Sequence, residues 1–165
     1  MSHLIFIGID PGIKLGISII NFQSEVLYTD TYNLSIDGKN KGVQYLNLFN
    51  KIIELIEWAE YKYKCVPSKD ILLVYELVSR HIGTLAAHSY GAITGIVQLI
   101  CAIKNIEYVS IPVKVIKKMS TGNGNASKQQ MMQAVRENWN IEPIDDNSSD
   151  SLWIAECGRR LDLVV

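Results

Sequence analysis

The sequence predicts an α/β protein built on a mixed five-stranded sheet with helices on both faces. Three observations predict it. Short runs rich in β-branched and other apolar residues occur five times along the chain. The first three follow one another with only turns between them, which is typical of an antiparallel meander. The last two alternate with stretches of helical periodicity, so the meander is extended into a sheet covered by helices.

The amino-terminal third predicts the meander and the first helix. The first apolar run ends at Asp10, directly before the turn signal Pro11-Gly12, and a tight turn at residues 23–24 joins the next two strands. Apolar residues then recur at helical spacing, so we expect an amphipathic helix. The expected strands cover residues 3–10, 15–22 and 25–32, and the helix covers residues 43–63.

The rest of the chain predicts two more strands and three helices. The apolar run that ends on Glu76 is a buried strand, and Ser127 to Gln130 has the form of a capping box at a helix start. The resulting order, β-β-β-α-β-α-β-α-α, is that of an RNase H-like domain. The expected strands cover residues 70–76 and 107–112; the helices cover residues 84–103, 127–139 and 147 or 148 to 161.

Length and composition predict a single soluble domain over residues 1–165. Apolar residues make up 48% of the chain and charged residues 20%, an ordinary globular balance. The amino terminus lacks the features of a signal peptide, and the longest apolar run, residues 93–103, is too short to span a bilayer. Three cysteines with no Cys-x-x-Cys pair argue against a disulfide framework or a zinc site. We therefore expect a cytoplasmic protein that does not contact a membrane.

Charge is distributed unevenly although its net value is −1. Residues 104–136 hold six basic residues and one acid, whereas residues 137–165 hold seven acids and two arginines. One interpretation is a phosphate-binding surface beside a metal centre. The other is two solvated faces of opposite sign, and charge alone favours it.

Acidic residues stand where strands end and where the last helix begins. Asp10 and Glu76 close two buried strands, where ionised carboxylates are costly unless something pairs with them. Asp150 lies inside the last helix, with Asp146 or Asn147 one turn earlier on the same face. Oxygen ligands without His or Cys suit Mg²⁺ or Mn²⁺, and two such ions suit phosphodiester hydrolysis.

Each of these acids also has an ordinary explanation. Asp10 before Pro-Gly can shape a turn, and Asp145, Asp146 or Asn147 can cap a helix. Taken together, the positions favour a metal site, with Asp146 as the preferred fourth ligand, Asn147 as its alternative and Asp145 as a surface residue. Residues 120–125 are expected to form a flexible loop without P-loop order.

Two lysines are candidate phosphate contacts, and two glycines mark a candidate packing surface. Lys117 and Lys128 flank the 120–125 loop and could face a scissile phosphate, although either one alone is better explained as a solvated residue. Gly91 and Gly95 are one helical turn apart. They would allow close approach of another backbone, either the sheet or the same helix of a second subunit.

Four motifs, in order, resemble the RuvC family of Holliday-junction resolvases. Gly8-Ile-Asp10-Pro-Gly12, with Gly16 beyond it, is similar to the family's opening motif, and Glu76 to its second acid. Residues 112–128 resemble its basic segment and Thr-Gly-Asn-Gly loop, and Asp146-Asn-Ser-Ser-Asp150 its last acidic motif. The Asp-Asp-Asn-x-x-Asp form is more similar to bacteriophage members, such as those of lactococcal phages, than to the bacterial enzyme.

The resemblance implies a homodimer that makes paired, symmetric nicks in four-way DNA junctions and depends on Mg²⁺ or Mn²⁺. It implies that Asp10, Glu76 and Asp150 bind the metal and that Lys117 and Lys128 face the phosphate. The expected DNA-binding residues are Arg80, His81, Lys114, Lys117, Lys118, Asn123 and Lys128.

Two positions depart from the bacterial pattern. Bacterial members carry Asp three residues before the last acid, where this chain has Asn147, and an aromatic residue that stacks on junction bases where it has Ser79. The second departure predicts a looser sequence preference and wider tolerance of branched DNA. A catalytically silent branch-binding protein is the main alternative; an actin-like or sugar-kinase-type phosphotransferase would need a second domain, for which 165 residues leave no room.

Overall fold

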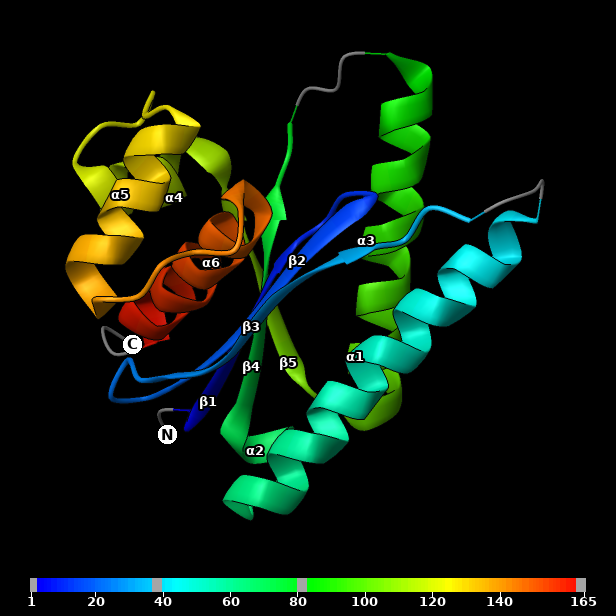
Figure 1. The fold of residues 1–165 in the computed structure, drawn as a ribbon. Coiled ribbons are helices and arrows are strands. Elements are labelled where there is room, and N and C mark those ends of the chain that lie inside the picture. Colours follow the sequence, from blue (N-terminus) through cyan, green and yellow to red (C-terminus); the bar gives the residue numbers. More distant parts are fainter. Residues whose placement is uncertain (1–2, 37–39, 80–82, 163–165) are drawn as a thin grey trace.

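A single five-stranded sheet organises the computed structural model, which describes residues 3–36, 40–79 and 83–162 (Figure 1). The strand order is β3-β2-β1-β4-β5. Strands β1, β2 and β3 pair antiparallel, whereas β4 pairs parallel with both β1 and β5. The strands are β1 (Ile5–Asp10), β2 (Lys14–Asn21), β3 (Val26–Asn33), β4 (Ile71–Leu77) and β5 (Glu107–Pro112).

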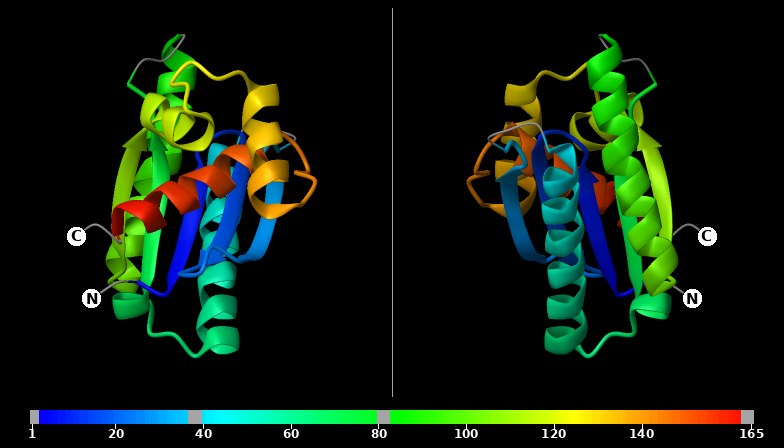
Figure 2. Two further views of the ribbon diagram at one scale, coloured as in Figure 1. Left: turned by 90° about the vertical axis from the view of Figure 1, so that its left-hand side faces the viewer. Right: turned by 90° about the vertical axis from the view of Figure 1, so that its right-hand side faces the viewer.

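Helices cover both faces of this sheet (Figure 2). The helices α1 (Lys41–Tyr63) and α3 (Thr84–Lys104) lie on one face, and α4 (Val113–Thr121), α5 (Lys128–Trp139) and α6 (Asp146–Asp162) lie on the other. A short helix, α2 (Pro67–Asp70), leads into β4. The predicted fold, a mixed five-stranded sheet with helices on both faces, is therefore confirmed.

Successive side chains of the buried strands point to opposite faces of the sheet, so the hydrophobic core has two parts. In β1, Ile5, Ile7 and Ile9 face α1 and α3, whereas Phe6 faces the α4–α6 side. Successive side chains of a strand point to opposite faces, so Gly8 and Asp10 share the α6 side with Phe6. The same rule places Leu72, Val74 and Glu76 of β4 on that side. The two strand-end acids thus face the same layer of helices.

The predicted elements lie within two residues of their observed bounds, but two short helices were missed. Ser127 does cap α5 through the predicted capping box with Gln130. Helix α4 was not predicted because three of its first four residues are β-branched, which disfavours helix. Helix α4 ends at Thr121 and is capped by Gly122 in the left-handed conformation (φ 79°). The loop that was predicted to begin at residue 120 therefore begins at residue 122.

Helix α3 contains the apolar run of residues 93–103 that was predicted to be too short to span a bilayer. The whole helix, of 21 residues, is long and apolar enough to cross a membrane by length and composition alone, which is weak evidence for a single helix. Ile93, Val97 and Ile100 are instead buried against the sheet side of the core, as in a globular protein. A Cβ built on Gly91 or Gly95 would meet nothing within 4 Å. These glycines therefore face outward, and the proposed close approach of the sheet to them was wrong.

Candidate metal centre

Asp10 and Glu76 meet because β1 and β4 are parallel neighbours in register. Ile9 lies opposite Tyr75, so the next residue of each strand, Asp10 and Glu76, reaches the same level of the sheet on the same face. Tyr90 of α3 holds the end of β4: its hydroxyl donates to the Glu76 carbonyl oxygen at 2.9 Å and accepts from the Val78 amide at 3.2 Å. No pattern in the sequence predicted that this tyrosine contacts the second acid.

The start of α6 is set by Asp145, which caps the helix. Its Oδ1 accepts hydrogen bonds from the Ser148 amide at 2.9 Å and the Thr31 hydroxyl at 2.7 Å, and the Ser148 hydroxyl accepts from the Asp145 amide at 3.0 Å. Burial would raise the pKa of Asp145, but these hydrogen bonds outweigh it and hold the pKa below its usual value. The expectation that Asp145 is a plain surface residue was therefore wrong.

With Asp145 as the cap, Asp146 and Asp150 fall one turn apart and point toward the strand-end acids. Burial, followed by the charges of Glu76, Asp150 and Asp146, raises the pKa of Asp10 well above its usual value. Burial and then Asp150 raise the pKa of Glu76 to about 7. Burial and then Asp146 raise the pKa of Asp150 to about 6. Asp10, Glu76 and Asp150, from β1, β4 and α6, are thus close enough to oppose one another's ionisation, and the charge of Asp146 adds to the effect on Asp10 and Asp150.

Two lysines oppose this negative charge. The Lys128 ammonium donates a hydrogen bond to Asp146 Oδ2, and the charge of Lys117 partly offsets the rise in the pKa of both Glu76 and Asp150. The side chains of Lys128 and Asp146 are 74% and 27% exposed, so the pair lies on the solvent side of the cluster. The structure therefore brings together all six residues predicted to be catalytic.

The donor set fits a hard divalent cation, although the carboxylate oxygens stand apart. Within residues 3–36, 40–79 and 83–162, no three His, Cys, Asp or Glu side chains are arranged to hold a metal ion as they stand. Lys128 occupies one oxygen of Asp146 in this arrangement. Asn147 donates its side-chain amide to Asp145 at 3.4 Å, so it belongs to the helix cap. Asp146 as the fourth ligand, with Asn147 as its alternative, stays a prediction.

A hollow of about 450 Å³ lies beside Glu76, between the ends of β4 and β5 and the start of α4. Lys114 and Lys117, one helical turn apart on α4, line it together with Asn125. Lys118 is on α4 outside this lining, and Asn123 shapes the following loop by accepting from the Asn125 amide at 3.0 Å. Of the other predicted DNA-binding residues, Arg80 and His81 lie outside the described residues.

Similarity to known proteins identifies the family to which this arrangement belongs. The family model described as "Crossover junction endodeoxyribonuclease RuvC" matches residues 6–158. The chain belongs to the RuvC family. A RuvC of that description from Prochlorococcus marinus is 30% identical over 155 residues, which cover 90% of this chain and 92% of the relative. Another, from Pseudothermotoga lettingae, is 28% identical over 157 residues, 93% of each chain.

Solved structures of RuvC confirm the predicted RNase H-like fold. The structure titled "T. thermophilus RuvC in complex with Holliday junction substrate" superposes with a TM-score of 0.81, covering 98% of this chain and 97% of that one at 16% identity. A second Thermus thermophilus RuvC structure gives 0.73 at 17% identity, covering 92% of this chain and 90% of that one. At such identities the likeness shows the fold. Family membership makes this chain a nuclease of the metal-dependent RuvC class. The likeness to bacteriophage members stays a prediction, since the relatives named above are bacterial.

Proposed function

We propose that this chain is a metal-dependent endonuclease that resolves four-way DNA junctions by paired nicks. The observation that carries the proposal is the convergence of Asp10, Glu76, Asp146 and Asp150 beside Lys117 and Lys128. Three buried carboxylates with raised pKa values, Asp10, Glu76 and Asp150, make a poor structural core. They make a good site for cations that neutralise them and bring the oxygens closer.

We assign the metal site to Asp10, Glu76, Asp146 and Asp150, with Mg²⁺ as the cofactor, Mn²⁺ as its substitute and two ions per site. Two such ions would activate a water molecule and stabilise the leaving oxygen of a phosphodiester. For Asp146 to serve as a ligand, it must exchange Lys128 for the cation. Lys128 is then available to donate to a phosphate oxygen. Lys117 of α4, which lines the hollow at the end of β4, would face the same phosphate.

The DNA path follows the basic residues near this site. Lys114 and Lys117 line the hollow beside Glu76, and Lys118 extends the basic surface along α4. Backbone phosphates suit this lining because ammonium groups bind them without reading sequence. Asn123, Arg80 and His81 complete the predicted DNA contacts.

The outward face of α3 supports the proposed homodimer. Leu99 and Ile103 are 53% and 58% exposed, and the open glycines Gly91 and Gly95 lie on the same helix. Apolar side chains beside glycines on one helix face suit close packing against the same helix of a second subunit across a two-fold axis. Two subunits would then present two metal sites, as paired nicks require. We place this activity in the cytoplasm of a bacterial cell.

A synthetic four-way junction tests the proposal. Incubation with Mg²⁺ or Mn²⁺ should give symmetric nicked duplexes, whereas incubation without metal should give none. Asp10→Asn should abolish nicking and leave junction binding largely intact. Binding without nicking by the wild type at every metal concentration would instead establish the silent branch-binding alternative.

Cleavage mapping on mobile junctions of varied sequence tests the predicted loose preference, which rests on Ser79. We expect cuts at many sequences and on other branched DNA. A tight consensus would contradict the predicted loose preference without affecting the rest of the proposal.

A further inference from the structure

The end of β4 faces a proline on each side at the level of Leu77. Leu77 is paired with Pro112 of β5, and continuing the β1–β4 register for two residues sets Pro11 opposite it as well. In a parallel ladder, the residue opposite Leu77 is the one that donates its N–H to the Glu76 carbonyl oxygen. Proline has no N–H, so neither neighbouring strand can supply this hydrogen bond.

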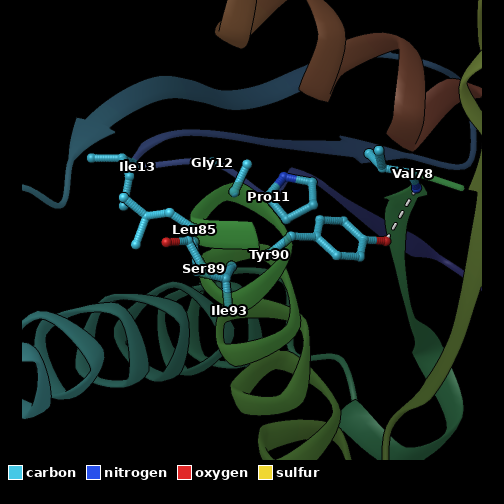
Figure 3. A pocket seen from close by; sticks show the side chains of 9 residues that line it. Pro11, Gly12, Ile13, Val78, Leu85, Ser89, Tyr90 and Ile93 are labelled. Atoms are coloured by element: carbon cyan, nitrogen blue, oxygen red, sulfur yellow. Dashed lines mark hydrogen bonds between the residues drawn. The ribbon is translucent and has the colours of Figure 1, made fainter. Parts of the chain in front are cut away.

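The hydroxyl of Tyr90 takes the place of the missing strand partner, and Figure 3 shows its ring reaching from α3 to Val78 at the end of β4. It donates to the Glu76 carbonyl oxygen at 2.9 Å and accepts from the Val78 amide at 3.2 Å. A residue of a parallel neighbour opposite Leu77 can make the same two contacts, one with the preceding carbonyl and one with the following amide. Burial raises the pKa of the Tyr90 hydroxyl, so it keeps the proton that it donates at neutral pH.

Tyr90 extends from a helix that is itself fixed to the sheet. The apolar residues of α3 that are buried in the core are Ile93, Val97 and Ile100. The Gln98 amide of the same helix donates to the Tyr75 hydroxyl of β4 at 2.8 Å. Helix α3 covers one face of the sheet, whereas the Glu76 side chain is on the α6 face. Tyr90 therefore holds the β4 backbone from one face and leaves the metal centre on the other face open.

We propose that Tyr90 is a positioning residue for the metal centre, because its hydroxyl fixes the backbone of Glu76 and thereby the direction of this carboxylate. The inference rests on the proposed function and deepens it, since Glu76 is one of the four proposed ligands. The Asp10 backbone is held by the β1–β2 ladder, opposite Gly16, and does not depend on a side chain in this way. Loss of a hydrogen bond that orients a metal-binding residue costs about 10–100-fold in metal affinity or activity.

Titration calorimetry with Mn²⁺, in the absence of DNA, tests the inference. Tyr90→Phe keeps the ring and removes only the hydroxyl. Tyr75→Phe is the matched control, because it removes the hydroxyl of the other hydrogen bond between α3 and β4 and leaves the contacts to the Glu76 carbonyl oxygen and the Val78 amide in place. Hydrogen exchange of the Val78 amide, measured on metal-free protein, reports the Tyr90 contact itself.

Tyr90→Phe should weaken Mn²⁺ binding about tenfold and raise the Mg²⁺ concentration for half-maximal nicking by a similar factor. Saturating Mg²⁺ should recover most of the nicking rate, because the bound cation then holds the carboxylate in place. The affinity of metal-free protein for a four-way junction should not change. The Val78 amide should exchange faster in Tyr90→Phe alone. Tyr75→Phe should keep wild-type metal affinity even if its melting temperature falls.

Three results would overturn the inference. Tyr90→Phe could keep wild-type Mn²⁺ affinity. Both variants could lose metal affinity equally, which would make the general packing of α3 on β4 responsible. The Val78 amide could exchange as fast in the wild type as in Tyr90→Phe, which would show that the hydroxyl does not hold the backbone. A wild type that binds Mn²⁺ and fails to nick junctions would count against the proposed function alone, because the titration needs no DNA.

Discussion

Gly16 lies directly against the backbone of Asn147: a Cβ added to Gly16 would stand 2.1 Å from the Asn147 carbonyl oxygen. Gly16 is also paired with Asp10 across β1 and β2. The missing side chain therefore lets the first turn of α6 settle beside the strand that carries Asp10. Gly8 has the same role a helical turn further along α6, where a Cβ would stand 2.1 Å from the Ser151 carbonyl oxygen.

Gly16→Ala should therefore push the first turn of α6 away from the sheet and carry Asp146 and Asp150 with it. We expect metal affinity to fall at least tenfold and the free energy of unfolding to fall by about 1–3 kcal/mol, as for an overpacked core. Titration calorimetry with Mn²⁺ and denaturant unfolding measure the two effects. Gly91→Ala is the control for metal affinity, because its Cβ meets nothing within 4 Å in the subunit and Gly91 lies on α3, outside the elements that carry the four acids. Equal metal affinity in both variants would contradict this role for Gly16.

The raised carboxyl pKa values predict how the stability of metal-free protein changes with pH. Those of Glu76 and Asp150 are about 7 and 6, above the ordinary values of 4.5 and 3.8. Between the ordinary and the raised pKa of each carboxyl group, the folded state thus binds more protons than the unfolded state. The stabilisation is complete below the ordinary values and is lost as pH rises through 6 and 7. The melting temperature should fall by on the order of 5 °C from pH 5 to pH 8, as calorimetry can measure.

Divalent cations should reverse this trend, because they bind the ionised carboxylates and displace protons. The stabilisation by Mg²⁺ should therefore grow from pH 5 to pH 8. Glu76→Gln, which cannot ionise, should flatten the metal-free profile and weaken the response to Mg²⁺. A metal-free wild type whose melting temperature is constant over this range would show that the acids do not constrain one another.

Local patterns in the sequence predicted the strands and the strand-end acids well. The alternation of residues 3–10 and 70–76 fixes which face Asp10 and Glu76 occupy, and the capping box fixes the start of α5. Helix α4 escaped prediction because its β-branched residues have low helix propensity and its stability comes from packing Ile116 into the core.

The arrangement around the acids depends on tertiary contacts that local patterns do not contain. Asp145, Asp146 and Asn147 all have the composition of a helix cap. Asp145 fills that position through the Ser148 amide, and the Thr31 hydroxyl, 114 residues away, donates to the same carboxylate. Tyr90 likewise reaches the Glu76 backbone from a separate helix. The proposal of Asp146 as the fourth ligand likewise draws on a tertiary arrangement, in which the Asn147 amide donates to Asp145 at the helix cap.

The choice between Asp146 and Asn147 can be tested by paired substitutions. Asp146→Asn should weaken Mn²⁺ binding roughly tenfold or more, since it removes a charged ligand oxygen. Asn147→Ala should leave Mn²⁺ affinity within about twofold, since its amide only donates to Asp145. Calorimetric titration of both variants measures this. A loss of affinity confined to Asn147→Ala would show that the wrong residue has been assigned as the fourth ligand.

The outward face of α3 predicts the effect of charge on assembly. Leu99→Glu places a carboxylate in the proposed contact, where it would be desolvated twice across a two-fold axis. Sedimentation should then show monomers at concentrations where the wild type is dimeric, with the fold unchanged because Leu99 is 53% exposed. Leu46→Glu, at a similarly exposed position (56%) on α1, is the control. A dimer that survives Leu99→Glu and dissociates with Leu46→Glu would move the contact to α1.

Lys128 offers a way to separate metal binding from catalysis, because it contacts Asp146 rather than the buried acids. Lys128→Gln removes the cation that competes for Asp146 and leaves the site more negative. Mn²⁺ affinity should therefore be unchanged or higher, whereas the nicking rate should fall by about 10²–10³ because a phosphate contact is lost. Lys118→Gln, on the same basic surface but without contact to Asp146, should lose only DNA affinity. If Lys128→Gln instead loses metal affinity in proportion to its activity, Lys128 organises the ligands and does not act on the phosphate.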